Sequence, residues 1–430
     1  MEIKEIFNQL KRKIYENKNT SLMLGGRLIA QAVPILLTPL FTRIYSPEEF
    51  GYFGAYVTIV SIIAMLSNGR YCLAIMLPKE QSKAQRLVWI SILLTSISTI
   101  IFALILLFAG MPLFSALNIS TLNNYILTLV LSVLFIGVYE AIFYYFLREK
   151  RYKEIATNII IQAGFLVLAR LGAGFFKYTE GGLMYSYLVS YLVGTFLFLI
   201  MSRKDIAVFA KEKFEESIFK FMSMYSKFPK YSLFADLLKN FTFLSPNLFL
   251  NKAFGAVSAG YYALSDKILG SPVWFLTSSF GDVLKQEASE QFRETGSCVK
   301  VVRQTSKALF LIGIIPFALL FIFAPMVVPF VFGAQWEPAG RYIRIFTLMY
   351  FARFVVDPIT DVLYVIEKQS VKIWFELMKL VALVIGFVIG FIARDAYLGF
   401  LAWSSITSVV YVICFFISYR LSKGANVAIV

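Results

Sequence analysis

The chain has 430 residues, of which 59% are hydrophobic and 16% are charged, and its formal net charge is +15. A soluble protein is about half apolar and about a quarter charged, so this composition predicts an integral membrane protein. The sequence contains no histidine, which excludes Ser-His and Cys-His catalysis and His-ligated metal sites. Its three cysteines are far apart, so they predict neither a metal site nor a disulfide framework.

Apolar runs of about 20 residues are long enough to cross a bilayer as helices. In chain order, twelve runs have this length: 20–42, 52–77, 87–110, 123–147, 156–176, 182–202, 231–251, 258–283, 307–332, 343–366, 373–393 and 397–419. Many transporters consist of two such halves with the substrate path between them. We therefore expect an all-α integral membrane protein with about twelve transmembrane helices in two six-helix bundles around a central cavity.

The expected domains are a six-helix bundle over 1–205, a basic cytoplasmic linker over 206–230 and a second six-helix bundle over 231–430. Connections on one side of the predicted helices carry 28 lysines and arginines, and those on the other side carry six. Because cytoplasmic loops carry the excess, both termini are predicted to be cytoplasmic. The basic clusters alternate with apolar runs, so the positive charge indicates membrane topology and not nucleic-acid binding.

Two cytoplasmic segments have apolar residues on one helical face. Residues 3–14 and residues 206–226 each predict an interfacial helix on the inner leaflet. The alternative is a plain amphipathic connector that packs on its neighbours. In the first span, Pro34 and Pro39 predict a kink, because proline frees backbone carbonyls within a helix.

Thirteen charged residues lie within the predicted spans. They are Arg27, Arg70, Glu140, Arg170, Asp236, Lys239, Asp266, Lys267, Arg353, Asp357, Asp361, Glu376 and Lys379. A charge deep in a span costs about 2.5–3.5 kcal/mol on insertion scales and marks an internal pathway by default. Most of these residues are predicted to lie in the cytoplasmic half, so they indicate a hydrated cavity that is loaded from inside.

Arginine offers a fork of donors that suits phosphate, so these cations predict a site for a phosphate or diphosphate headgroup. The candidate substrate-binding residues are Arg27, Arg70, Arg170, Lys239, Lys267 and Arg353. The acids predict coupling to a proton or a sodium ion, and no other cofactor or metal is expected. The candidate ion-coupling residues are Asp266, Asp357, Asp361 and Glu140.

Spacing also supports a structural role for some of these charges. Arg353 and Asp357 are four residues apart, and Asp236 and Lys239 are three apart. Such neighbours can neutralise each other on one helix and simply hold the helices together. Arg70 has a different alternative, in which its side chain extends to inner-leaflet phosphates.

The stretch FTRIYSPEEFGYFGAYVTIVSIIAMLSNGRYCLAIMLPKE resembles the N-terminal signature of bacterial lipid-linked oligosaccharide flippases of the Wzx type. The family pattern Y-S-P-E-x-F-G, then a span, then R-Y-x-x-A-I-x-L-P fits Tyr45–Gly51 and Arg70–Pro78. Further matches are FPKYSLFADLL, AGYYALSDKILGSP and FGAQWEPAGRYIRIF, so the resemblance covers nearly the whole chain. Proteins of this type belong to the multidrug/oligosaccharidyl-lipid/polysaccharide exporter superfamily.

The resemblance implies transport of undecaprenyl-diphosphate-linked oligosaccharides to the periplasmic leaflet of the bacterial inner membrane, by ion-coupled alternating access. It implies a role in surface polysaccharide synthesis, such as the O-antigen of lipopolysaccharide, with membrane lipid, a glycan polymerase and a chain-length regulator as partners. Most matched motif positions are expected to shape turns and helix ends, and only Arg70 is expected to face the ligand. These positions are Tyr45, Ser46, Pro47, Gly51, Arg70, Tyr71, Pro78, Gly333, Trp336, Ala339 and Gly340.

Two other classes compete with a flippase. A drug or cation antiporter of the same superfamily should have a cavity dominated by acids, whereas four of the intramembrane cations here are arginines. A polytopic glycan polymerase should have a long outer loop with catalytic-type residues, whereas the predicted outer loops are short. The sequence therefore favours a transporter without enzymatic activity.

Overall fold

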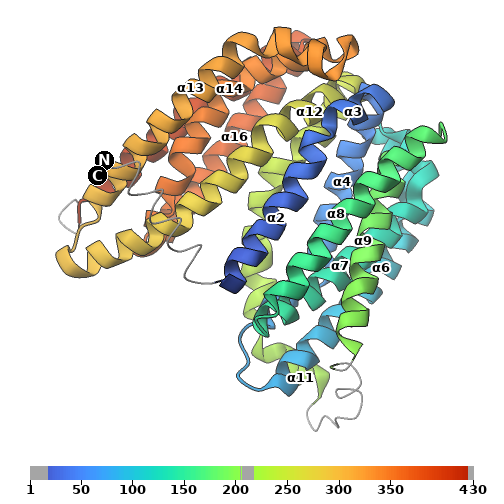
Figure 1. The fold of residues 1–430 in the computed structure, drawn as a ribbon, viewed down its shortest axis with the longest axis horizontal. Helices are drawn as coiled ribbons and strands as arrows, with labels where there is room; N and C mark the ends of the chain where they lie inside the picture. Colours follow the sequence, from blue (N-terminus) through green and yellow to red (C-terminus); the bar gives the residue numbers. More distant parts are fainter. Residues whose placement is uncertain (1–17, 204, 206–216, 425–430) are drawn as a thin grey trace. The chain divides into compact units, whose positions relative to one another are not determined.

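The computed structural model describes residues 18–203, 205 and 217–424, and within these ranges the chain is helical with no strand (Figure 1). The chain divides into two compact units on either side of the Gly260–Tyr261 bond. The first unit contains the described residues up to Gly260, and the second contains those from Tyr261 onward.

The first unit is a bundle of long helices. It comprises α2 (Lys18–Leu36), α3 (Thr38–Ile44), α4 (Pro47–Ser67), α5 (Tyr71–Ala74), α6 (Gln81–Ala116), η1 (Ser120–Tyr125), α7 (Ile126–Arg148), α8 (Tyr152–Phe175), α9 (Gly182–Met201), α11 (Ile218–Met224), η2 (Phe228–Ser232) and the first part of α12 (Leu233–Thr295). Helix α2 packs on α8, α8 packs on α9, and α9 packs on α7. In Figure 1, α2, α8 and α9 accordingly run side by side.

The second unit is built in the same manner. It comprises the rest of α12, α13 (Val299–Phe332), η3 (Ala334–Trp336), α14 (Glu337–Thr360), α15 (Val362–Val365), α16 (Gln369–Ala393) and α17 (Ala396–Leu421). Helix α14 packs on α13 and on α17, and α16 packs on α17. Aromatic rings fill the space between these helices, with Tyr342 edge-on to Phe400 at 4.6 Å and Phe346 edge-on to Trp403 at 5.1 Å.

Each of the twelve predicted spans has a helical counterpart in the described residues, so the predicted all-α membrane architecture is confirmed. Eight of the described helices are long and apolar enough by themselves to cross a membrane. The other four spans correspond to α2 with α3, the two parts of α12, and α14 with α15. These four carry most of the intramembrane charges, which explains their lower apolar character.

The kink predicted in the first span is present between α2 and α3. Helix α2 ends at Leu36 and α3 begins at Thr38. The Thr38 hydroxyl donates a hydrogen bond to the Pro34 carbonyl at 2.8 Å, one of the carbonyls near the break. The prediction of a kink from Pro34 and Pro39 is therefore confirmed.

Several of the matched motif residues shape turns and helix ends, as expected. The Ser46 hydroxyl accepts a hydrogen bond from the Glu49 amide at 3.2 Å, and the Glu49 carboxylate accepts one from the Ser46 amide at 2.7 Å. This reciprocal cap, with Pro47 in the first turn, starts α4. Gly333 has a φ of 106° at the end of α13, a conformation that favours glycine, and Trp336 beside it is fully buried.

Helix α12 is interrupted at Gly255, whose φ of 81° and ψ of 168° are not helical. Before this break α12 runs antiparallel to α4. The Thr58 hydroxyl donates a hydrogen bond to the Leu244 carbonyl at 3.0 Å, and the Asn251 amide donates one to the Gly51 carbonyl at 3.2 Å. The first part of α12 thus belongs to the first unit. The predicted boundary at 206–230 is based on equal numbers of predicted spans on its two sides, and it stays a prediction.

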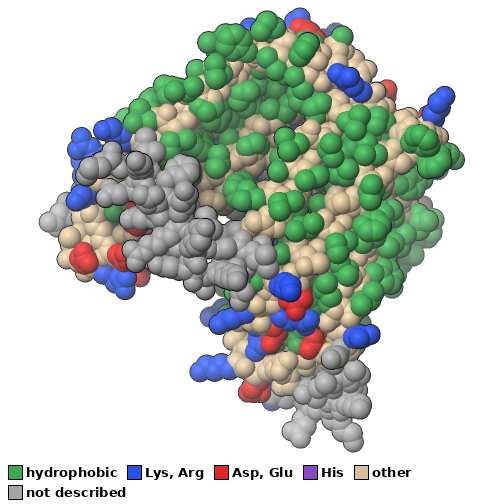
Figure 2. All heavy atoms as spheres, in the orientation of Figure 1, with side chains coloured by type: hydrophobic (Ala, Val, Ile, Leu, Met, Phe, Trp, Pro, Cys, Tyr) green, Lys and Arg blue, Asp and Glu red, His purple; other side chains and the backbone are tan. Residues whose placement is uncertain are grey.

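The outward faces of the helices are apolar. In the second unit, Ile315 is 66% exposed and Phe330 is 85% exposed on α13. Around the first unit, Figure 2 shows hydrophobic side chains along the helices, with charged side chains gathered near the end that carries α11. This distribution is that of helices which face acyl chains along their length and water at their ends.

The predicted interfacial segment at residues 3–14 lies outside the described residues, and the second is described from residue 217 onward. There α11 buries Phe221 beneath the Arg86 guanidinium, whose central carbon is 4.5 Å from the ring centroid. On the other side of α11, Phe219 is 83% exposed. One face of this segment therefore packs on its neighbours, and the other presents apolar surface.

Candidate functional site

A tight turn at the end of α4 fixes the position of Arg70. Gly69 and Arg70 have φ angles of 54° and 61°, in the left-handed region that non-glycine residues seldom adopt. The Asn68 side-chain oxygen accepts a hydrogen bond from the Arg70 amide at 2.9 Å and closes the turn. Helix α5 then starts at Tyr71. A conformation of this kind costs of the order of 1–3 kcal/mol and is often found at functional sites.

Arg70 lies between two carboxylates within the first unit. One terminal nitrogen of Arg70 is 2.7 Å from the Asp236 carboxylate on α12, with the two side chains 14% and 32% exposed. The Asn68 amide that borders this turn donates a hydrogen bond to the Glu140 carboxylate on α7 at 3.2 Å. The Arg70 Nε atom is buried and has no hydrogen-bond partner among the described residues. One donor of the guanidinium is therefore unsatisfied.

The Arg70–Asp236 pair adds a contact that the spacing of charges along one helix does not predict. Asp236 pairs with Arg70, whereas its pairing with Lys239, expected from the three-residue spacing, stays a prediction because it involves a side chain outside the described residues. The side chains of Lys239 and of Arg27 lie outside the part of the chain that the structure describes. The Arg70 cluster therefore consists of Asn68, Arg70, Glu140 and Asp236.

A second polar cluster lies within the second unit. The Tyr350 hydroxyl on α14 donates a hydrogen bond to the Asp266 carboxylate on α12. The Arg353 guanidinium carbon lies 5.8 Å from the Tyr350 ring centroid, and Arg353 Nε is 3.1 Å from the Asp357 carboxylate. The Arg353–Asp357 pair predicted from the four-residue spacing is confirmed. Lys267 follows Asp266 on α12 and is partly buried.

The two remaining intramembrane acids of the second unit, Asp361 and Glu376, pair with lysines. Lys285 Nζ is 3.1 Å from one oxygen of Asp361, and Lys372 contacts the other oxygen. Two turns inside α16, the buried Lys379 is 2.7 Å from Glu376. Both carboxylates are thus neutralised by cations, in contrast to Asp266, which forms no ion pair among the described residues.

Arg170 on α8 has an aromatic environment. Its guanidinium carbon lies 5.5 Å from the Phe41 ring centroid and 5.2 Å from the Phe53 ring centroid, and its Nε is 3.3 Å from the Ser186 hydroxyl. The residue is 5% exposed, and no carboxylate pairs with it within the described ranges. Cation–π contacts of this kind stabilise a desolvated guanidinium by about 2 kcal/mol.

Several residues of these clusters were not among the candidates. Asn68 stands beside Arg70 in the sequence, but its contact with Glu140 depends on the packing of α7. Tyr350 on α14 is 84 residues from Asp266 on α12 in the sequence, so only the fold brings the two side chains together. Lys285 and Lys372 were assigned to cytoplasmic connections, and only the fold brings them to Asp361.

The family relationship follows from a match to a family model. A model described as "Polysaccharide biosynthesis protein" matches residues 40–341, a range that includes the Arg70 cluster and Asp266. The chain belongs to this family. A search of curated proteins finds no significant match.

Solved transporter structures share the fold of this polysaccharide biosynthesis protein. A multidrug resistance MATE family transporter of the MOP superfamily has 14% identity and a TM-score of 0.72, over 92% of this chain and 94% of that chain. The lipid II flippase MurJ has 14% identity and a TM-score of 0.73, over 93% of this chain and 87% of that chain. A MATE transporter of Vibrio cholerae, VcmN, has 13% identity and a TM-score of 0.60, over 96% of this chain and 97% of that chain.

Proposed function

We propose that this chain flips undecaprenyl-diphosphate-linked oligosaccharide repeat units from the cytoplasmic to the periplasmic leaflet of a bacterial inner membrane. The family match and the membrane-spanning fold shared with MurJ support a transporter of lipid-linked substrates. The observation that carries the proposal is Arg70, a partly buried arginine whose buried Nε donor has no hydrogen-bond partner among the described residues, held in a left-handed turn at the end of α4.

Arg70 has the chemistry that a diphosphate requires. A guanidinium binds two oxygens of a phosphate group through parallel hydrogen bonds, which a lysine cannot do. In the structure one terminal nitrogen is occupied by Asp236, so an entering diphosphate competes with this carboxylate for the same fork. We infer that substrate binding breaks or loosens the Arg70–Asp236 pair.

The same competition provides a route to ion coupling. Asp236 pairs with Arg70, and the Glu140 carboxylate lies on the other side of Asn68. A diphosphate that joins this cluster adds negative charge to a site that already holds two carboxylates, which raises their affinity for a proton. Proton uptake at Glu140 or Asp236 then accompanies substrate binding, and Asp266 is the further coupling candidate in the second unit.

The proposed orientation places the Arg70 end of α4 at the cytoplasmic side, with both termini in the cytoplasm. It is supported by the excess of lysines and arginines in the connections on that side. Sugar chains delivered in this direction would serve surface polysaccharide synthesis, such as that of O-antigen. A glycan polymerase and a chain-length regulator are the proteins that would use the flipped product.

The test is flipping in proteoliposomes that contain a fluorescent polyprenyl-diphosphate oligosaccharide. We expect Arg70→Ala to lower the initial flipping rate by about tenfold to a hundredfold, because a charge-assisted contact contributes about 1.5–3 kcal/mol. Arg70→Lys should restore only part of the rate. Lys153→Gln, which removes an exposed cation from the start of α8, is the matched control. An unchanged rate for Arg70→Ala at equal reconstitution would refute the role of Arg70 and remove the main support for the proposal.

A multidrug or cation antiporter is the second candidate function. The observation that favours it is Asp266, an acid in a membrane helix that accepts a hydrogen bond from a tyrosine and forms no ion pair with a cation of the described residues. The same proteoliposomes distinguish the two functions. Efflux of a cationic dye that depends on Asp266, without flipping of the oligosaccharide lipid, would select the antiporter.

A further inference from the structure

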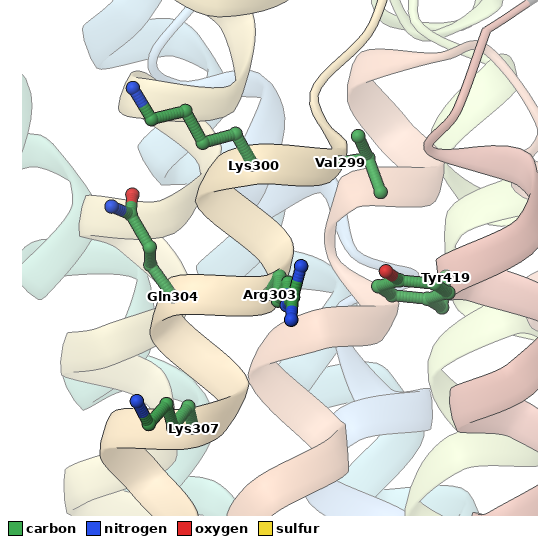
Figure 3. Close-up of a pocket in the computed structure, with 6 residues that line it drawn as sticks. All are labelled: Val299, Lys300, Arg303, Gln304, Lys307 and Tyr419. Carbon is green, nitrogen blue, oxygen red and sulfur yellow. The ribbon is translucent and has the colours of Figure 1, made fainter.

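One face of α13 is basic over its first turns. Lys300, Arg303 and Lys307 recur at helical spacing and are exposed, and they line a cavity of about 460 Å³ together with Val299, Gln304 and Tyr419. Figure 3 shows Arg303 between Tyr419 of α17 and the two lysines of α13, which extend away from Tyr419 together with Gln304. The cavity lies wholly within the second unit.

The charge of this cavity is uncompensated by the residues that line it. None of its six lining residues is acidic, and none of its three cations forms an ion pair within the described part of the chain. Lys300 also lies in the first turn of α13, where the helix dipole adds positive potential. The cavity therefore attracts an anion.

The surface next to the cavity is apolar and exposed. Along the same face of α13, the cations are followed at helical spacing by Phe310 and Ile314, which are 45% and 41% exposed. On α17, which contacts α13, Phe416 and Val412 precede Tyr419 at the same kind of spacing and are 63% and 50% exposed. The three cations thus adjoin two exposed apolar surfaces, one on α13 and one on α17. Each surface suits one acyl chain of a two-chain lipid.

We propose that this basic cavity binds the headgroup of an anionic phospholipid from the leaflet in which α13 begins. Basic pockets between membrane helices bind anionic headgroups through the same combination of clustered cations and adjacent apolar surface. The exposure of the three cations suits a bilayer lipid that exchanges freely. In the orientation of the proposed function, on which this assignment of the leaflet rests, the lipid belongs to the inner leaflet.

The test is native mass spectrometry of the purified full-length protein in detergent, titrated with dioleoyl phosphatidylglycerol. The variant is Lys300→Gln combined with Arg303→Gln and Lys307→Gln. The matched control is Lys79→Gln with Lys153→Gln and Lys220→Gln, which removes three exposed cations from the first unit. At about 1 kcal/mol for each cation near a lipid surface, we expect the variant to lose roughly tenfold to a hundredfold in apparent affinity, and the control to keep it.

Further titrations identify the ligand. Dioleoyl phosphatidylethanolamine should bind the protein and the variant alike, and inorganic phosphate should not displace phosphatidylglycerol. Equal losses in the variant and in the control would mean general electrostatic attraction and would overturn the site. Stronger binding of undecaprenyl diphosphate than of phosphatidylglycerol at this cavity would overturn the choice of lipid. Because no transport is measured, a failure of the proposed flipping activity leaves this result unaffected, and the reverse also holds.

Discussion

Gly51 on α4 lies so close to Ala256 on α12 that a Cβ atom added to Gly51 would be 1.8 Å from the Ala256 carbonyl oxygen. Gly260 repeats the relationship, because its added Cβ would be 1.7 Å from the Pro47 carbonyl oxygen. Both neighbours are backbone atoms, so a side chain could enter only if the helices separated. The α4–α12 contact in the first unit is thus a backbone-to-backbone seam of the kind that small residues permit in membranes.

This seam gives the first prediction. Gly51→Ala should lower the stability of the purified protein by about 2–3 kcal/mol or more, because inserting a methyl group into close-packed backbone forces the helices apart. The measurement is the midpoint of thermal unfolding in detergent. Gly164→Ala on α8 is the control, since an added Cβ there has no atom within 4 Å. Equal midpoints for Gly51→Ala and Gly164→Ala would contradict the close contact.

The second prediction separates the structural and ligand-binding roles of Arg70. Arg70→Asp alone or Asp236→Arg alone should destabilise the first unit, since each puts like charges together at a partly buried site. The combined exchange should recover most of the thermal stability, because it restores an ion pair. It should not recover flipping, because an acid at position 70 repels the diphosphate. Recovery of both properties would show that the pair is only structural.

The third prediction concerns the acids of the second unit. Asp266 contacts Tyr350, with the Arg353 side chain next along α14, and it has no ion-pair partner in the described part of the chain. Asp266→Asn should therefore leave the protein folded and remove the stimulation of flipping by an imposed proton or sodium gradient. Gradient stimulation that survives this change would exclude Asp266 as the coupling group.

Asp361 should behave in the opposite way, which is the fourth prediction. Asp361→Asn leaves Lys285 and Lys372 without the carboxylate that they share. Removing one member of a partly buried ion pair exposes the others to mutual repulsion, so this variant should unfold at a lower temperature. Its gradient dependence, measured in the surviving protein, should match that of the unchanged chain.

The fifth prediction tests the orientation of the helices. Cys72, Cys298 and Cys414 are all buried, so the native chain should react slowly with a membrane-impermeant maleimide. Lys153→Cys should be labelled from the cytoplasmic side in spheroplast-derived inverted vesicles, and Arg394→Cys should be labelled in intact spheroplasts. Both positions are exposed. Labelling of the two positions from the same side would refute the predicted topology.

The sequence predicted the helices well because most membrane spans are long apolar runs that need no distant partner to be recognised. The Arg353–Asp357 pair was predictable for a similar reason, since both residues lie on one helix at a four-residue spacing. The Arg70–Asp236 pair was not, because it depends on the antiparallel contact of α4 and α12. Arg170 has no charged partner within the described ranges, and its contacts with Phe41 and Phe53 leave no periodic signal in the sequence.

The contact between α4 and the first part of α12 also limits which insertions and deletions this part of α12 can tolerate. Leu244 and Asn251 contact α4, and Asp236 contacts Arg70 in the turn just after α4, because the three residues recur near a helical period. Deleting a single codon between residues 237 and 243 would turn Asp236 about 100° away from the face that carries Asn251, since a helix has about 3.6 residues per turn. Arg70 would lose its carboxylate without being mutated itself. In-frame deletions in this segment should therefore be as damaging as charge reversals, whereas substitutions on its opposite face should be tolerated.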